Sequence, residues 1–379
     1  MNPLDVQTLD DSSLVAHTAR QLVPSEVESS FLIHAPLELL ARAALLPLVP
    51  EAHRGAARRR IAAIADRYQR DFRPAATPAP LEFEEAGHAT RALQRGLDEG
   101  NSGLVDSAVL WLAARHDVKT LRRLLLPLVV DRVGLAAHAP ILFAELPRVN
   151  DRLEGVPDLL RAPMHTLSKE RGTVMTRLDS DAVLSAQTLE ARLGATPHVP
   201  VDSFSIAPRL RGVQPLVTSM LAGVERLPTE TVRRSLLRVA AQSMLEDDPE
   251  SAPYIWTHCL TLPLAVLENA DVMAEVGAAH VVAATHVLAF RATSGRVTLS
   301  RDWQPTRALI DRFAPGSPSR AAALRALVVR AALHHDAHLV KYTRACLDAA
   351  AHDPGHELLF FAAAERLGAW WDEHPNLAD

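Results

Sequence analysis

Apolar residues recur along most of the chain at spacings of three and four positions, the period that places them on one face of an α-helix. Between residues 118 and 130, such a stripe is formed by Leu121, Leu124, Leu125 and Leu128. The same period predicts helices over residues 36–47, 55–70, 88–97, 103–115, 118–130, 230–244, 252–267, 272–292, 319–333, 337–350 and 356–371. The pattern therefore indicates an all-α protein.

Composition agrees with this prediction and also bears on domain number. Ala, Leu and Arg, all strong helix formers, are frequent among the 379 residues, whereas aromatic residues make up only 4%. Proline-bearing breaks fall at residues 72–80 and 194–208. The second break could divide two halves, but the histidine pattern described below lies on both sides of it. We therefore expect one large multi-helix domain over residues 1–379, with 194–208 as a connector.

Charge and cysteine content exclude several classes of partner. The formal net charge is −5, and the one dense basic run, residues 54–60, is typical of a solvated helix face, so we expect no nucleic-acid partner. Apolar runs such as residues 43–50 are far shorter than the roughly 20 residues that span a bilayer, so we expect no membrane segment. With an acidic N-terminus and only Cys259 and Cys346, the chain is expected in the reducing cytoplasm.

Several motifs of cofactor enzymes do not occur in the sequence. The chain contains no GxGxxG, P-loop, HExxH, GxSxG or CxxC motif. ATP, a dinucleotide or a tightly bound flavin therefore has no sequence support. Externally supplied NADPH or a separate reductase protein remains compatible with the sequence.

Histidine is the chemically distinctive residue, with 17 copies, many of them inside apolar helical runs. Four contexts stand out, around His34, His138, His258 and His338, the last with Lys341 three positions later on the same helix face. Neutral imidazole is the commonest metal ligand in proteins. Taken singly, each histidine is more often a satisfied core or capping residue, and spacing alone does not bring the four together.

The remaining candidates favour structural roles. His280 and His286 are six positions apart and face different sides of one predicted helix, whereas His334 and His335 fall at a helix end, where positive charge meets the helix dipole. An aromatic pocket or ordinary core packing accounts equally well for the scattered aromatic residues Trp256, Phe290 and Trp303.

The histidine contexts also carry a family resemblance. The strongest segment is 336–347, DAHLVKYTRACL, followed by 258–265, HCLTLPLA, and 136–142, AAHAPIL. His34 precedes an Ala/Leu-rich run, and the chain closes with FFAAAERLGAWW at 360–371. In this order the segments resemble those of the questin oxidase-like family of fungal and bacterial aromatic polyketide pathways. The resemblance extends over nearly the whole chain.

The resemblance implies an all-α fold with a buried histidine-lined centre and an oxygenase of secondary metabolism. The expected substrates are dioxygen and an aromatic, often anthraquinone-type, small molecule, with oxygen insertion of the Baeyer–Villiger type or ring cleavage as outcome. It further implies non-haem Fe(II) bound by four histidines and a carboxylated lysine. Carried over by motif, these ligands are His34, His138, His258, His338 and Lys341.

Carboxylation explains how a lysine could serve as a ligand. A protonated ammonium has no lone pair to offer a metal ion. Burial favours the neutral amine, which adds carbon dioxide to give a carbamate with an anionic oxygen. Four imidazoles and one such oxygen suit Fe(II). Without the resemblance, Lys341 is expected to be a surface lysine whose aliphatic chain covers apolar surface while its ammonium group reaches solvent.

Two carboxylates are expected to act on the ligands from outside the coordination sphere. Asp336 and Glu145 are candidates to orient imidazole N–H groups, as second-layer carboxylates do in metal proteins. The chain departs from the family pattern at Glu145, Leu142 and Ala337, and these departures bear on substrate and product while metal binding remains possible.

Two other functions remain open at this stage. One is a metal-free, NADPH-dependent Baeyer–Villiger-type oxidase, in which the histidines act as acids and bases. The other is a non-catalytic helical interaction protein that has the family fold without the reaction. Metal content distinguishes both from an iron oxygenase.

Overall fold

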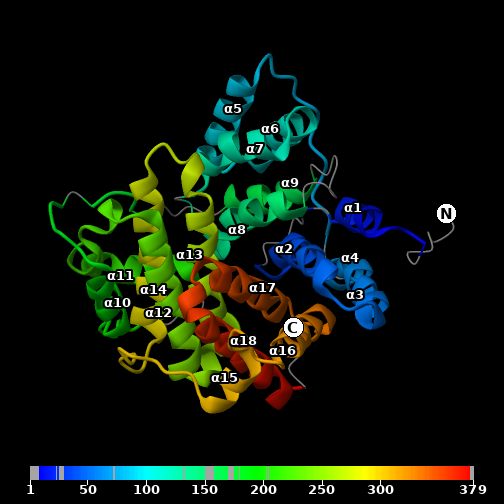
Figure 1. The fold of residues 1–379 in the computed structure, drawn as a ribbon. Helices are drawn as coiled ribbons and strands as arrows, with labels where there is room; N and C mark the ends of the chain where they lie inside the picture. Colours follow the sequence, from blue (N-terminus) through cyan, green and yellow to red (C-terminus); the bar gives the residue numbers. More distant parts are fainter. Residues whose placement is uncertain are drawn as a thin grey trace. The chain divides into compact units, whose positions relative to one another are not determined.

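The computed structural model describes residues 8–22, 24, 30–70, 73–130, 132, 134–149, 158–169, 175–178, 180–201, 203 and 205–375. Within these ranges the chain is helical and forms no strand, which confirms the all-α prediction (Figure 1). The chain divides into two compact units. The first consists of Met1–Pro47, Glu51–Thr173 and Val272–Ala274, and the second of Leu48–Pro50, Val174–Asp271 and Glu275–Asp379.

The first unit is built from α1 to α9. The bounds are α1 Asp11–Gln21, α2 Ser30–Leu45, α3 Glu51–Ala62, α4 Ile64–Gln69, α5 Ala86–Glu99, α6 Ser102–Arg115, α7 Val118–Leu125, α8 Gly134–Val149 and α9 Asp158–Leu167, with short 3-10 turns at Leu46–Leu48 and Leu126–Leu128. Helix α2 packs against α8 and α4, and α6 packs against α5 and α9. Leucine and alanine side chains supply most of this core.

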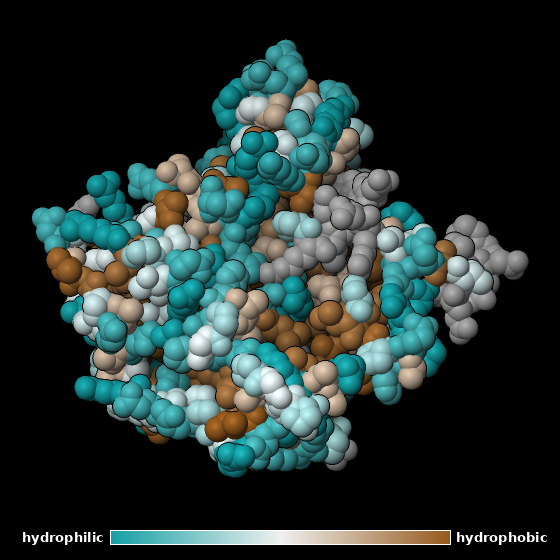
Figure 2. Space-filling model, in the orientation of Figure 1, coloured by the Kyte–Doolittle hydropathy of each residue, from teal (hydrophilic) through white to brown (hydrophobic). Residues whose placement is uncertain are grey.

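A tight connection turns the chain from α5 into α6. Gly100 has a φ of 73°, in the left-handed region that glycine adopts without a steric penalty. The next residue, Asn101, caps α6 by accepting a hydrogen bond from the backbone of Leu104 at 3.0 Å. The apolar face of α5 is buried, and the face over α5 and α6 in Figure 2 is mostly hydrophilic, as expected for an amphipathic pair.

A buried ion-pair cluster joins α2 to α4. Glu38 is 1% exposed and accepts hydrogen bonds from the guanidinium of Arg42 and the hydroxyl of Tyr68, both at 2.6 Å, and another from Arg67. The two carboxylate oxygens of Glu38 accept all three hydrogen bonds. Glu38 therefore compensates the buried charge of Arg42 and fixes the packing of the two helices.

The second unit is built from α10 to α18. The bounds are α10 Ala186–Gly194, α11 Ile206–Leu221, α12 Thr229–Glu246, α13 Thr257–Glu268, α14 Val276–Ser294, α15 Arg307–Phe313, α16 Arg320–Leu333, α17 Ala337–His352 and α18 Glu357–Glu373, with short turns at Val224–Arg226, Pro249–Ser251, Ala270–Val272 and Pro354–His356. A π-helical turn, Ala252–Trp256, leads directly into α13. Helix α13 is buried on almost every side and packs against α12, α14 and α17.

The structure corrects several expected boundaries. Pro36 does not begin a helix but lies inside α2, which starts at Ser30. The break at 194–208 does not separate the two units, because both of its ends belong to the second one and α11 already starts at Ile206. The units divide at Thr173 and Val174 instead. The single domain over 1–379 stays a prediction.

One segment qualifies by length and composition as a membrane span, contrary to expectation. The window Phe31–Leu48 is apolar over 18 residues, and 72% of it is buried within the protein. It also contains the buried ion pair of Glu38 and Arg42. Such burial is typical of a core helix of a soluble helical protein.

Candidate metal centre

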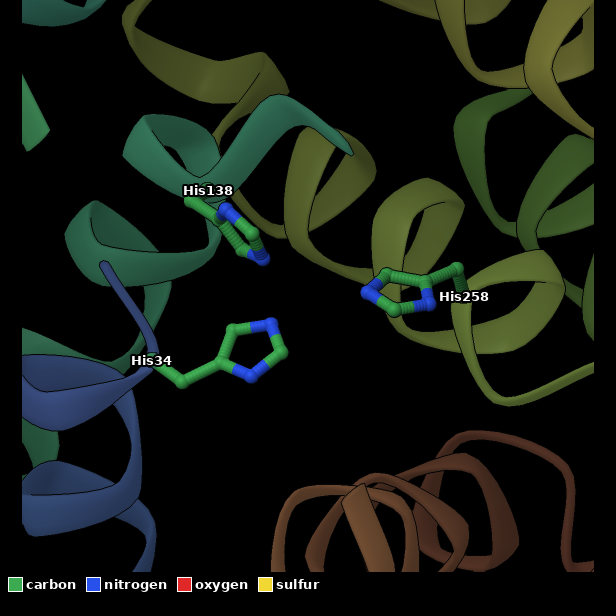
Figure 3. Close-up of side chains that lie close together, drawn as sticks. All are labelled: His34, His138 and His258. Carbon is green, nitrogen blue, oxygen red and sulfur yellow. The ribbon is translucent and has the colours of Figure 1, made fainter. Parts of the chain in front are cut away.

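The first unit buries a pair of histidines on α2 and α8. His34 is 8% exposed and His138 is 2% exposed. Their ring centroids lie 4.8 Å apart with the planes at 85°, so that one ring presents its edge to the face of the other (Figure 3). The packing of α2 on α8 thus brings together two predicted ligands that are more than a hundred residues apart in sequence.

Both histidines of this pair begin the same tripeptide, His-Ala-Pro, and both prolines lie inside their helices. Pro36 has no amide hydrogen to give to the carbonyl of Leu32, and Pro140 has none for that of Ala136. Each histidine therefore lies on a helical turn with one backbone hydrogen bond fewer than usual.

Neither carboxylate of these two helices is shown to orient a ring. Glu38 lies one turn after His34, but its oxygens accept from Arg42, Arg67 and Tyr68. Glu145, the predicted outer partner, is half-buried and lies seven residues, two helical turns, after His138 on α8. Its role in orienting His138 stays a prediction.

The second unit buries a second pair, on α13 and α17. His258 is 8% exposed and His338 is 6% exposed, and their ring centroids lie 5.2 Å apart at 67°. The ring of Tyr254 meets His338 edge to face at 5.0 Å. Figure 3 also draws His258 with the helix α13 that carries it. Because α13 packs against α17, two further predicted ligands lie side by side.

A backbone hydrogen bond selects the tautomer of His258. Its Nδ1 donates to the carbonyl oxygen of Tyr254 at 2.5 Å, so the lone pair lies on Nε2. Burial, the charge of His338 and the charge of Lys341 all lower the pKa of His258 well below its usual value. This imidazole is therefore neutral at pH 7, the form that binds a metal ion.

A carboxylate orients His338. The Nδ1 atom of His338 lies 3.3 Å from Oδ2 of Asp336, and Asp336 is fully buried. The other carboxylate oxygen caps α17 by accepting from the backbone of Leu339 at 3.0 Å. Asp336 thus fixes both the start of α17 and the orientation of the His338 ring.

Lys341 lies one turn after His338 on α17 and is 7% exposed. After burial and the charge of His338, the charge of Lys341 is the third cause that lowers the pKa of His258. A buried lysine at this position differs from the surface lysine with an exposed ammonium group that is expected without the resemblance. The structure therefore brings Lys341 into the environment of the second pair.

The other apolar histidines have local partners. His280 Nε2 lies 3.0 Å from the Thr229 hydroxyl, and His286 Nδ1 donates to the Val282 carbonyl at 2.8 Å. His334 accepts a hydrogen bond from the backbone of Asp336 at 3.0 Å. These contacts agree with the structural roles that the sequence favours for them.

Sequence reasoning missed a further buried polar cluster in the first unit. Asp106 Oδ2 on α6 lies 3.0 Å from Arg161 and 3.0 Å from Nδ1 of His165, both on α9. The residues are separated by more than fifty positions and share no motif, so only the packing of α6 on α9 reveals them. Tyr254 was likewise missed, because its contact depends on the π-helical turn before α13.

Both pairs offer imidazole nitrogen atoms, which can act as metal ligands, in a buried environment. In the second pair each ring donates through Nδ1, and His258 keeps the lone pair on Nε2, the arrangement usual for metal-binding histidine. Fold and site together define an all-α protein whose two helical units each bury a pair of neighbouring histidines.

Comparison with known proteins adds no relative to this description. No family model, no curated protein and no solved structure matches the chain. The resemblance to the questin oxidase-like family therefore rests on the segments quoted from the sequence.

Proposed function

We propose that the protein is a non-haem iron oxygenase that uses dioxygen to oxidise an electron-rich aromatic small molecule. The observation that supports this most is the pair His258 and His338, neutral or oriented through Nδ1, with Lys341 buried beside it. The proposed compartment is the cytoplasm, where the buried thiols of Cys259 and Cys346 stay reduced.

The donor set fits a ferrous ion. Imidazole nitrogen suits iron, zinc and copper alike, so the choice of Fe(II) among them rests on the family resemblance. The proposed ligands are His34, His138, His258, His338 and Lys341, and the resemblance assigns all five to one ion. When bound, the iron supplies the binding and activation of dioxygen.

The chain's own residues position and hold protons around this centre. Asp336 holds the Nδ1 proton of His338, and the Tyr254 carbonyl holds that of His258. Tyr254 is 42% exposed and packs edge to face with His338, so it presents an aromatic residue beside a proposed ligand. Stacking on such a residue suits an aromatic substrate. Electrons come from the substrate, from external NADPH or from a separate reductase.

Metal analysis of the purified protein tests the proposal. We expect one iron per chain, and we expect His34→Gln and His258→Gln each to lower the occupancy severely. The matched control is His286→Gln, because His286 is also buried and also donates Nδ1 to a carbonyl four residues earlier. Unchanged iron in both ligand variants refutes the proposal, and two ions per chain, each lost with a different pair, refutes a single centre.

The lysine assignment is tested by isotope labelling. Protein equilibrated with ¹³C-bicarbonate should show a carbamate resonance that Lys341→Ala removes and that the exposed-lysine control Lys119→Ala retains. Iron occupancy should fall in Lys341→Ala and recover in part with added acetate. Unchanged occupancy without acetate contradicts the modified lysine.

The same measurements distinguish the two other functions. A metal-free NADPH-dependent oxidase consumes dioxygen and NADPH with an aromatic substrate after chelation of all metal. A non-catalytic interaction protein consumes neither and contains no stoichiometric metal. Loss of substrate-dependent dioxygen uptake on chelation, with recovery on adding Fe(II), supports the iron oxygenase.

A further inference from the structure

Helices α11 and α14 of the second unit pack together (Figure 1). A buried guanidinium on α11 donates hydrogen bonds to side chains of α14. Arg209, near the start of α11, is 5% exposed. Its Nη1 donates to the hydroxyls of Thr293 at 2.5 Å and Ser294 at 2.6 Å, at the last turn of α14. Both partners are neutral, and burial lowers the pKa of Arg209. Within the described ranges, no carboxylate pairs with this charge.

A buried carboxylate at this end of α14, that of Asp247, already has other partners. Asp247 forms an ion pair with Arg291 at 2.5 Å. It also accepts the backbone N–H of Arg296 at 2.9 Å and that of Asp248 at 2.8 Å. Both oxygens of Asp247 are therefore bound to other donors.

A count of charges shows a positive surplus. Two buried guanidiniums, Arg209 and Arg291, face one buried carboxylate and a helix C-terminus worth roughly half a negative charge. The side chain of Arg296 lies at the same end of α14, with Nη1 3.4 Å from Nε2 of His198. Burying an uncompensated charge is costly, so an added anion would stabilise this end of the helix.

Two hydrogen-bond donors there are unused among the described residues. The Nε–H of Arg209 is buried and makes no hydrogen bond to any of them. Thr293 gives its hydroxyl hydrogen to the carbonyl of Ala289 at 2.7 Å, whereas the Ser294 oxygen only accepts from Arg209. The Ser294 hydroxyl hydrogen and the Nε–H edge of the guanidinium can therefore both serve a ligand.

We propose that Arg209 and Ser294 form a binding site for a small oxyanion, a phosphate or carboxylate group. An oxyanion supplies the missing negative charge, and two of its oxygens match the parallel N–H groups of a guanidinium edge. The site shares no residue with the proposed metal centre and does not depend on the proposed function. Its role would be to fix the packing of α11 on α14 when the anion is bound.

Thermal unfolding and calorimetry with inorganic phosphate test this site. At equal ionic strength, phosphate should raise the melting temperature of the wild-type protein in a saturable way, and sodium chloride should not. Arg209→Gln should abolish the response, and Ser294→Ala should weaken phosphate binding about tenfold, as expected for loss of a hydrogen bond to a charged group. Arg211→Gln, on the exposed side of the same helix, is the matched control.

The competing outcomes are distinct. Equal responses to phosphate and chloride, or a phosphate response that persists in Arg209→Gln, overturn the proposal. If Arg209→Gln fails to fold, Ser294→Ala with full phosphate affinity overturns it equally. Acetate in place of phosphate shows whether the site binds carboxylates as well. If neither anion raises the melting temperature, the proposed site is contradicted.

Discussion

The two histidine pairs are buried to a similar degree, but the carboxylates close to them in sequence have different partners. In the second unit the Tyr254 carbonyl and the Asp336 carboxylate hold the Nδ1 atoms of His258 and His338. In the first unit the only buried carboxylate of α2, Glu38, serves arginines and a tyrosine instead. A carboxylate one turn from a histidine therefore does not by itself indicate a metal site, since the carboxylate can instead form an ion pair with an arginine.

The largest effect in this comparison is expected at Glu38. Glu38→Ala removes the carboxylate that forms an ion pair with Arg42, which is only 3% exposed, and should destabilise the protein by about 3–5 kcal/mol. Urea denaturation measures the loss. Tyr68→Phe removes one hydrogen bond from the same cluster and should cost about 1 kcal/mol. Equal losses in the two variants would mean that Glu38 is not the compensating charge.

Acid sensitivity should come chiefly from the buried histidines of the second unit. Burial lowers the pKa of His286 to about 4. As the pH falls below the ordinary value near 6.5, the unfolded chain takes up a proton that the folded protein does not. Stability is thus full above pH 6.5 and falls by about 3 kcal/mol towards pH 4.

His286→Leu should remove this part of the acid sensitivity, as measured by urea denaturation at pH 7.5 and pH 5. His198→Leu, which alters an exposed histidine, is the control, and its free energy of unfolding should change with pH as that of the wild type does. A variant at His286 that loses stability with acid as steeply as the wild type would show that this histidine is not the group responsible.

The double role of Asp336 sharpens the contrast with Glu38. Asp336→Ala should cost only about 1 kcal/mol, the usual value of a helix cap, yet weaken metal retention by about 10- to 100-fold. Asp117 caps α7 in the same way, accepting from the backbone of Thr120 at 2.7 Å, and its neighbour in sequence, His116, is not a predicted ligand. Asp117→Ala should therefore leave metal retention unchanged, and equal metal loss in both variants would point to a general stability effect.

The smallest effect is expected at Tyr254. Tyr254→Phe should change nothing measurable in stability, because the atom that holds His258 is the backbone carbonyl. Tyr254→Ala loses the edge-to-face contact with His338, worth about 0.5–1.5 kcal/mol, and should impair binding of an aromatic substrate more than iron retention. Iron loss in Tyr254→Phe would contradict this assignment.

Much of the helical framework could be predicted from sequence, because apolar periodicity is a local property. The segments 88–97, 103–115 and 337–350 correspond closely to α5, α6 and α17. The prolines gave a wrong boundary. Pro36 predicts a helix start, but in the folded protein α2 continues on both sides of it. The π-helical turn 252–256 was expected to be ordinary α-helix, since hydrophobic spacing over five residues does not distinguish the two.

The candidate site was less accessible to sequence reasoning. Spacing could place His338 and Lys341 on one face of a helix, because they are three residues apart on α17. It could not join His34 to His138 or His258 to His338, since those pairs depend on which helices pack together. The partners of Glu38 were also hidden, because Arg67 and Tyr68 come from another helix.

The repeated His-Ala-Pro tripeptides have a consequence for how a ligand could exchange. In α2 and α8 the turn that carries the histidine lacks an amide donor two residues later, so it can tilt without breaking a regular helical hydrogen bond. Amide protons just before Pro36 and Pro140 should then exchange with solvent sooner than those in the middle of α13. Access to these rings would require only a local bend, with the rest of each helix intact.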